Sequence, residues 1–206
     1  MAEKSFGPDD VEILQRRRSH DGFLKVDSLT LRHRLFAGGW SGEVPRELIV
    51  RQRAVAVLLF DPLRNEVVMV RQFRVGMLQE QCDPWLLELV AGMVDHGEPH
   101  DEVARRESLE EANLSPVDLV QIGDYYNSPG TSNERVILFC GRVDASKAGG
   151  VYGLSHEHED IEVVVLSLEQ ALAKIESGAI NNAMSIIALQ WLQLNRQKLL
   201  QEWGVK

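Results

Sequence analysis

The chain has 206 residues, of which 44% are hydrophobic, and its formal net charge is −9 at pH 7. This composition supplies enough apolar residues for one large domain or for a domain with a small extension. The negative charge argues against a protein that binds the phosphate backbone of nucleic acids, which needs a basic surface, and we expect no nucleic-acid partner.

The cysteines and the apolar runs bear on the cellular compartment. Cys82 and Cys140 lie beside or within apolar runs, which indicates buried free thiols rather than a disulfide framework. The sequence has no apolar stretch of about 20 residues, so we expect no membrane span. Its N-terminus also lacks a secretory pattern. A cytoplasmic protein is therefore the expectation.

The first 50 residues are charged and contain short apolar and polar alternations at 11–18 and 23–36. These alternations predict several short strands, and the turn-rich sequence GGWSGEVP interrupts them. About 50 residues bury too little surface to be stable alone. We therefore predict a small β-rich subdomain at 1–50 that packs against the rest of the chain or against a partner chain.

Beyond this region, apolar runs of strand length are combined with helical patterns, and we assign 51–206 to one main domain. An Asp61-Pro62 turn indicates that the first two strands form a hairpin. A mixed sheet with helices on both sides, an α/β (α+β) arrangement, fits this order. We predict strands at 53–60, 66–75, 85–90, 117–127, 135–143 and 161–167, and helices at 168–177 and 182–203 besides the helix described next.

The stretch GMVDHGEPHDEVARRESLEEANL, at 92–114, predicts a loop followed by a helix. The helix should begin near Glu98-Pro99, because proline is tolerated at the first helical position. It should end at about Ala112, with Asn113 in the position of a left-handed cap.

Glu107, Glu110 and Glu111 share one face of this helix, because they are three and four residues apart. Their spacing alone leaves two interpretations open. Exposed helices often carry charge runs, and ordinary surface pairs would then join Arg105 with Asp101 and Arg106 with Glu102 or Glu110. Alternatively the carboxylates hold a hard divalent cation, since Mg²⁺ suits a few carboxylates together with substrate phosphates.

The wider pattern of this stretch resembles the Nudix box, G-x5-E-x7-R-E-U-x-E-E-x-G-U, in which U is a bulky apolar residue. Fixed residue types at fixed spacing are more specific than a lone glycine motif. Ser108 replaces an apolar residue and Asn113 replaces the second glycine, and neither change removes a carboxylate. The matching positions are Gly92, Glu98, Arg106, Glu107, Glu110, Glu111 and Leu114.

The resemblance covers almost the whole chain and is to the bacterial ADP-ribose pyrophosphatase branch of the Nudix hydrolases. RELIVR, VRQFRV, PWLLELVAG, SPG and ALQWLQL carry it. It implies an α/β/α sandwich with a mixed sheet, and hydrolysis of ADP-ribose to AMP and ribose 5-phosphate. Mg²⁺ is the implied cofactor, with Mn²⁺ as a substitute. The implied assembly is a homodimer that exchanges its N-terminal region, so that 1–50 serves dimerisation and substrate binding.

Position by position, the resemblance implies roles for individual residues. Glu107 and Glu111 match metal ligands, as does the Ala91 carbonyl. Glu110 is a second-line ligand, and Glu159 matches a ligand that reaches metal when substrate is present. Gly92, Glu98 and Arg106 support the box. The implied substrate contacts are Phe23 (from the other subunit in the family), Leu24, Arg46, Glu47, Arg51, Arg74, Met93, Ser128, Pro129, Gly130 and Glu134.

Cleavage of a pyrophosphate also needs a group that removes a proton from the attacking water. Such a base should not be a tight metal ligand. Glu157, in a polar loop, meets this requirement better than Glu107 or Glu111 on a rigid helix, and it matches the general base of the family.

Several of these residues have a plainer interpretation. Lone surface arginines are usually just solvated, and this interpretation fits Arg46, Arg51 and Arg74. Phe23 could be a core residue. His156 and His158 alternate with carboxylates, but no third His or Cys follows at zinc-ligand spacing. The loop SPGTSNE departs from the family's SPGGTSE because Thr131 replaces the second glycine, which puts the shape of this loop in question.

Two other functions remain alternatives. The first is a pyrophosphatase for another nucleoside diphosphate sugar, such as GDP-mannose, which would differ in the base pocket formed by the weakly patterned N-terminal region. The second is a nucleotide sensor that does not cleave its ligand. Sensors of this kind usually lack some box carboxylates, whereas Glu98, Glu107, Glu110 and Glu111 are all present.

Overall fold

The computed structural model describes residues 5–78 and 83–205. The chain divides into two compact units. The first unit is Met1–Gln52 with Tyr126–Glu134, and the second is Arg53–Tyr125 with Arg135–Lys206. The first unit thus contains a loop from much later in the chain, which the sequence analysis had placed in the main domain.

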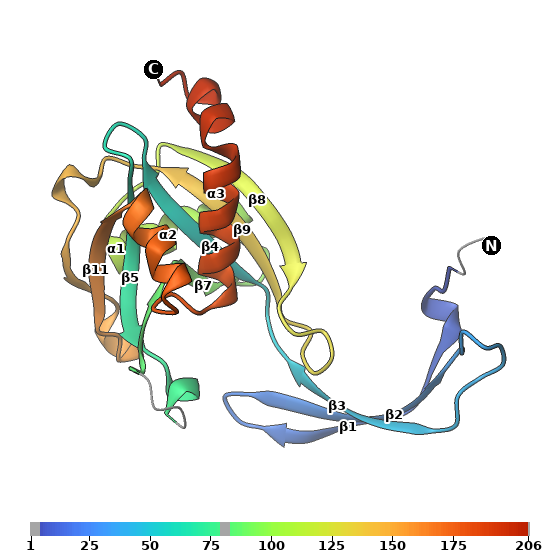
Figure 1. Cartoon of the computed structure of the whole chain (residues 1–206). Coiled ribbons are helices and arrows are strands. Elements are labelled where there is room, and N and C mark those ends of the chain that lie inside the picture. Colours follow the sequence, from blue (N-terminus) through green and yellow to red (C-terminus); the bar gives the residue numbers. More distant parts are fainter. Residues whose placement is uncertain (1–4, 79–82, 206) are drawn as a thin grey trace. The chain divides into compact units, whose positions relative to one another are not determined.

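The first unit is built on an antiparallel sheet of β1 (Val11–Asp21), β2 (Lys25–His33) and β3 (Val44–Val50), in that order (Figure 1). A short 3-10 helix, Pro8–Asp10, precedes β1. The loop at 126–134, called the late loop below, pairs with the end of β3. The Ile49 amide donates to the Thr131 carbonyl at 2.8 Å, and the Asn133 amide donates to the Ile49 carbonyl at 3.3 Å.

The first unit has almost no interior. In its described part no hydrophobic residue is buried, and β1 is exposed along its whole length. Among the polar residues of this unit, Asp27 is buried, at 2% exposure. Its burial is possible because Arg16 and Arg18 donate to its two carboxylate oxygens at 2.7 and 2.5 Å. This sheet is therefore held mainly by backbone hydrogen bonds and ion pairs, and its apolar side chains remain available for contacts.

The second unit contains an eight-stranded sheet within the described residues, in the order β10-β11-β5-β4-β9-β8. The short strands β6 and β7 pair with β5 and β4 respectively. Because β4 runs parallel to β9 and antiparallel to β5, the sheet is mixed as predicted. The strands are β4 (Ala54–Asp61), β5 (Glu66–Phe73), β6 (Trp85–Glu88), β7 (Val90–Met93), β8 (Asp118–Tyr126), β9 (Arg135–Arg142), β10 (Gly150–Tyr152) and β11 (Ile161–Ser167).

Helices cover both faces of this sheet because its central strands are apolar on both sides. Ala56, Leu58 and Phe60 of β4 pack with α2 (Leu168–Glu176) and α3 (Ala183–Glu202), which lie on one face (Figure 1). The alternate residues of β4 pack with α1 (His100–Ala112) on the other face. The α/β/α sandwich is therefore confirmed.

Three details differ from the predicted elements. The segment 85–90 is two strands rather than one, and the break at Leu89 lets β6 pair with β5 and β7 with β4. The strand β10 had no clear sequence pattern. Pro99 is the residue before the first turn of α1 rather than its first helical residue, because its ψ of 139° is extended. The left-handed cap at Asn113 is confirmed, with φ 52° and ψ 37°.

The structure bears on two earlier expectations, namely buried cysteine thiols and the lack of a membrane-spanning segment. Cys140 is buried, and burial raises the pKa of its thiol, while Cys82 lies outside the described residues. Across 5–78 and 83–205, no helix is both long enough and apolar enough to cross a bilayer.

Candidate active site

The strand β7 delivers the Nudix-box loop to the first turn of α1. Ala91 pairs with Ala56 of the central strand β4, which fixes its backbone in the sheet. Beyond β7 the chain turns with Gly97 at φ 83°, a conformation that favours glycine, and the Glu98 amide donates to the Asp95 carbonyl at 3.1 Å. The loop therefore places Ala91 beside the carboxylate face of α1.

Glu111 is the buried member of this carboxylate group, at 3% exposure. Its Oε2 accepts a hydrogen bond from the Ala91 amide at 3.1 Å. Burial raises the pKa of Glu111 to about 8, against the opposing effect of that hydrogen bond, and the charges of Glu107 and Glu159 raise it further. A cation placed here would remove the energetic penalty of ionising Glu111.

Glu107 lies one turn earlier on α1 and against the backbone of Gly92. A Cβ atom at Gly92 would overlap the Glu107 carboxylate, so this glycine is required for close approach rather than for its dihedral angles. Burial raises the pKa of Glu107 although Arg106 opposes the shift. The box glycine and the box glutamate therefore form one packing unit.

Arg106 connects the remaining carboxylates of the box. It donates to Glu98 at 3.1 and 3.2 Å, to Glu107 at 2.7 Å and to Glu110 at 3.1 Å. The Glu98 hydrogen bond contributes most to raising the pKa of Arg106, and the same bond lowers the pKa of Glu98. The Arg106–Glu110 surface pair thus forms, but as part of a larger network. Arg105 instead donates to the Pro116 carbonyl.

The donor set suits a hard divalent cation, although its carboxylates have other partners here. Within the part of the chain that the structure describes, no three His, Cys, Asp or Glu side chains form a ready-made metal cage. Glu107 is bound by Arg106 and Glu111 by Ala91. The fit therefore rests on oxygen chemistry, burial and the mutual repulsion of Glu107, Glu111 and Glu159. Cation binding by Glu107 has to compete with Arg106.

The polar loop before β11 supplies two further glutamates with different surroundings. Glu159 Oε2 accepts from the Leu154 amide at 3.0 Å, and Gly153, at φ 109°, leaves room for the Glu159 Cβ. Glu157 ends a 3-10 turn, Ser155–Glu157, and its side chain is 56% exposed beside His156 at 3.7 Å. The loop thus anchors Glu159 and leaves Glu157 at the surface.

Arg74 is held by a residue that the sequence analysis missed. Its Nε donates to Glu88 Oε2 at 2.6 Å, and Glu88 is only 5% exposed. The charge of Arg74 also opposes part of the rise in the pKa of Glu111. An acidic residue inside the apolar run WLLELV was the available signal, because buried carboxylates are normally paired.

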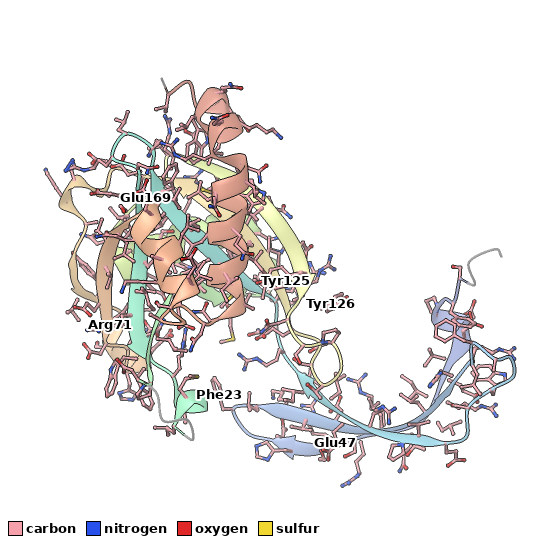
Figure 2. The ribbon with its side chains drawn as sticks, in the orientation of Figure 1. Phe23, Glu47, Arg71, Tyr125, Tyr126 and Glu169 are labelled. Atoms are coloured by element: carbon pink, nitrogen blue, oxygen red, sulfur yellow. The ribbon has the colours of Figure 1, made fainter. Side chains whose placement is uncertain are left out.

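The predicted substrate contacts of the first unit form a second group. Phe23 lies at the turn between β1 and β2 and is 86% exposed (Figure 2). The Arg51 guanidinium carbon is 5.9 Å from the centre of the Phe23 ring, and Arg51 Nε is 3.5 Å from Glu134 Oε1. The structure therefore brings Phe23, Arg51 and Glu134 together within one chain. Leu24, beside Phe23, is 41% exposed.

Glu47, labelled in Figure 2, and Arg46 lie on β3. Both residues line a pocket of about 600 Å³ within the first unit. Gly130 and Thr131 line it from the late loop. The Arg46 guanidinium donates to the Pro45 carbonyl at 2.8 Å.

The late loop accommodates Thr131 without strain. Of the described residues other than glycine, positive φ angles occur at Asn65, Asn113 and His158, so Thr131 adopts an ordinary conformation. Its hydroxyl lies 3.4 Å from that of Ser128, and Pro129 and Gly130 form the exposed turn between them. Met93, in the second unit, is 44% exposed, and its carbonyl accepts from Arg106 at 3.4 Å.

Comparisons with known proteins found relatives that match nearly the whole chain. ADP-ribose pyrophosphatases of Escherichia coli strain K12 and Haemophilus influenzae are 47% and 43% identical to the chain, over 97% and 96% of its length and 96% and 93% of theirs. GDP-mannose pyrophosphatase of Cronobacter sakazakii is 35% identical over 72% of this chain and 78% of that protein. A solved structure titled "Crystal structure of ADP compounds hydrolase" shares the fold, with a TM-score of 0.70 at 20% identity and coverage of 98% and 99%.

A family model described as NUDIX domain matches residues 50–185, which contain the glycine, arginine and glutamates of the box. The contacts among Gly92, Glu98, Arg106 and Glu107 give these box positions a physical role in this structure. The chain belongs to the NUDIX domain family.

Proposed function

We propose that the protein is a pyrophosphohydrolase that cleaves ADP-ribose to AMP and ribose 5-phosphate. The observation that carries the choice of substrate is the 43–47% identity to ADP-ribose pyrophosphatases over nearly the full length of the chain. The similarity includes the first unit, whereas the GDP-mannose pyrophosphatase match covers 72% of the chain. The first unit, which we propose to bind the substrate, therefore lies within the similarity to the ADP-ribose enzymes.

Glu107 and Glu111 would hold a divalent cation together with the Ala91 carbonyl, with Glu110 and Glu159 as further ligands. Enzymes of this family generally depend on divalent metals, and we infer Mg²⁺ because the donors are carboxylate and carbonyl oxygens. When bound, the cation neutralises phosphoryl oxygens and lowers the pKa of a bound water. Mn²⁺, which accepts the same donors, is the expected substitute.

Glu157 is proposed as the general base. Its exposure and its position beside the anchored Glu159 fit a group that meets the attacking water without being a tight ligand. Arg74 would contact a phosphate, since guanidinium groups bind phosphate oxygens in a bidentate manner. Glu88 would hold the Arg74 side chain in place just after the end of β5.

Phe23, Leu24, Arg46, Glu47, Arg51, Ser128, Pro129, Gly130 and Glu134, with Met93, are the proposed substrate contacts. An exposed aromatic ring beside a guanidinium is a suitable platform for a purine base. The Glu134 carboxylate can accept hydrogen bonds from ribose hydroxyls. The exposure of Phe23 speaks against its being a core residue.

A homodimer with an exchanged N-terminal region is proposed from the state of the first unit. The described part of that unit has no buried hydrophobic residue, and β1 is exposed throughout. Exposed edge strands and apolar side chains of this kind are normally covered in a soluble assembly. Because Phe23 lies beside Arg51 of its own chain, the two residues would be exchanged together.

A product assay tests the substrate. The purified protein with Mg²⁺ is given ADP-ribose, GDP-mannose and other nucleoside diphosphate sugars, and products are separated by ion-exchange chromatography. We expect AMP and ribose 5-phosphate from ADP-ribose at the highest kcat/KM. Higher kcat/KM for GDP-mannose would replace this substrate by the alternative. Binding without cleavage of any compound would indicate a sensor, against which the complete set of Glu98, Glu107, Glu110 and Glu111 argues.

A further inference from the structure

The end of β3 and the late loop are joined by a side chain that none of the assigned roles uses. Asn133 Oδ1 accepts a hydrogen bond from the backbone amide of Arg51 at 2.7 Å. The Asn133 amide in turn donates to the Ile49 carbonyl at 3.3 Å. Asn133 therefore binds Ile49 of β3 through its backbone and Arg51, just beyond β3, through its side chain.

This bond fixes the backbone of Arg51, the residue whose guanidinium lies between an aromatic ring and a carboxylate. The guanidinium carbon is 5.9 Å from the Phe23 ring centre, and Nε is 3.5 Å from Glu134 Oε1. A separation of 3.5 Å is too long for a strong charged hydrogen bond. The Arg51–Glu134 contact alone would therefore hold Arg51 only loosely.

The Glu134 carboxylate is oriented by a second asparagine of the same loop. Asn127 Nδ2 donates to Glu134 Oε2 at 2.9 Å, and Ser132 Oγ accepts from the Glu134 amide at 3.1 Å. Glu134 Oε2 is thus engaged, whereas among the described residues Oε1 has only the long contact with Arg51. Oε1 keeps acceptor capacity for a hydroxyl group of a ligand.

We propose that Asn133 is a positioning residue for substrate binding, which holds Arg51 beneath the Phe23 ring by accepting the Arg51 amide. Asn127 likewise positions Glu134, by donating a hydrogen bond to its carboxylate. The proposal rests on the proposed function in one respect, namely that Phe23, Arg51 and Glu134 contact the substrate. Ordering these side chains before the ligand arrives reduces the entropy that binding would otherwise have to overcome.

The test is a double-mutant cycle on steady-state kinetics with ADP-ribose and Mg²⁺. Asn133→Ala should raise KM about 2- to 10-fold, the range that corresponds to one net hydrogen bond, and leave kcat within about twofold. Asn133→Asp keeps the acceptor and should restore KM. In an Arg51→Ala background, Asn133→Ala should raise KM no further, because the residue through which it acts is already missing.

Ser41→Ala is the matched control, since Ser41 Oγ accepts the His33 amide at 3.0 Å elsewhere in the same unit. Its effect on KM should be small and additive with Arg51→Ala. An unchanged KM in Asn133→Ala, an effect additive with Arg51→Ala, or a loss confined to kcat would overturn the proposal. If Asn133→Ala has a lowered melting temperature by circular dichroism, Asn133→Ser is used instead. The serine hydroxyl is too short to reach the Arg51 amide.

The substrate panel separates this inference from the proposed function. If the wild-type protein cleaves another nucleoside diphosphate sugar better than ADP-ribose, the proposed substrate is wrong. The same cycle on the better substrate then still decides the role of Asn133. If the wild-type protein binds ADP-ribose without cleaving it, the proposed function is wrong, and the same cycle measured on the Kd for ADP-ribose decides the role of Asn133.

Discussion

Glu111 combines deep burial with a raised pKa, and it faces two other carboxylates. In Glu111→Gln the amide keeps the shape of the side chain and can still accept from the Ala91 amide. We expect turnover to fall by roughly 10²-fold or more, because a preorganised charge that a cation needs is lost. The melting temperature should stay the same or rise. Near wild-type turnover at saturating Mg²⁺ would contradict the metal assignment.

The raised pKa of Glu111 predicts how the stability of the metal-free protein depends on pH. The folded state binds the proton up to about pH 8, whereas the unfolded state releases it near the ordinary value of 4.5. The free energy of unfolding should therefore fall as pH rises between these values, by up to about 1.4 kcal/mol per pH unit from this group. Urea titrations in chelator should show a shallower slope in Glu111→Gln, and equal slopes would refute the prediction.

Glu157 is proposed to act on the proton of water rather than on metal. Removing a general base typically lowers the rate by about 10²–10⁴-fold. Glu157→Gln should lose kcat in this range, with KM and the Mg²⁺ requirement nearly unchanged. Glu159→Gln is the comparison, since a ligand should change the Mg²⁺ concentration needed for half-maximal activity. If Glu157→Gln shows that same shift instead, Glu157 is a ligand and another carboxylate is the base.

At the scale of the element, α1 ends in a left-handed residue where the Nudix pattern has glycine. Asn113 has φ 52°, and its amide and that of Leu114 bond back to the carbonyls of Leu109 and Ser108. Asn113→Ala should lower the free energy of unfolding by about 1 kcal/mol, because alanine tolerates this conformation poorly. Asn113→Gly should stay within about 0.5 kcal/mol of wild type. Denaturant unfolding measures both, and equal stability of the two variants would contradict the cap.

How far the sequence predicts an element depends on where its information lies. The helix α1 was predictable because proline, three spaced glutamates and Asn113 are local signals. The break at Leu89 was not, because it depends on which neighbouring strand each half of 85–93 finds, and that is decided by register across the sheet.

Some residues of the site could be predicted from the sequence, and others could not. The box carboxylates follow from spacing along one helix, and the family resemblance supplied candidates elsewhere. The role of Glu88 and the attachment of Asn133 to Arg51 depend on side chains far apart in sequence. Hydrogen bonds over 14 and 82 residues leave no periodic trace in a single sequence.

At the scale of the whole molecule, the exchanged dimer predicts that one site draws on two chains. Phe23→Ala and Glu111→Gln chains, each weakly active alone, should partly rescue one another when unfolded together and refolded. In the mixed dimer one site would receive both intact residues and the other neither. Activity equal to the average of the parents, with mixed dimers confirmed by mass, would show that each site belongs to one chain. A monomer by light scattering would refute the shared site directly.

The first unit consists of two segments of the sequence, which determines how this unit can be exchanged between relatives to test its proposed role in substrate binding. A chimera with a foreign 5–52 but the native 126–134 would set a new β3 against Thr131 and Asn133, whose bonds to Ile49 and Arg51 join the two segments. Exchanging one of the two segments without the other separates these partners. The smallest part that can be exchanged as a whole therefore consists of two segments, with junctions after residues 52, 125 and 134.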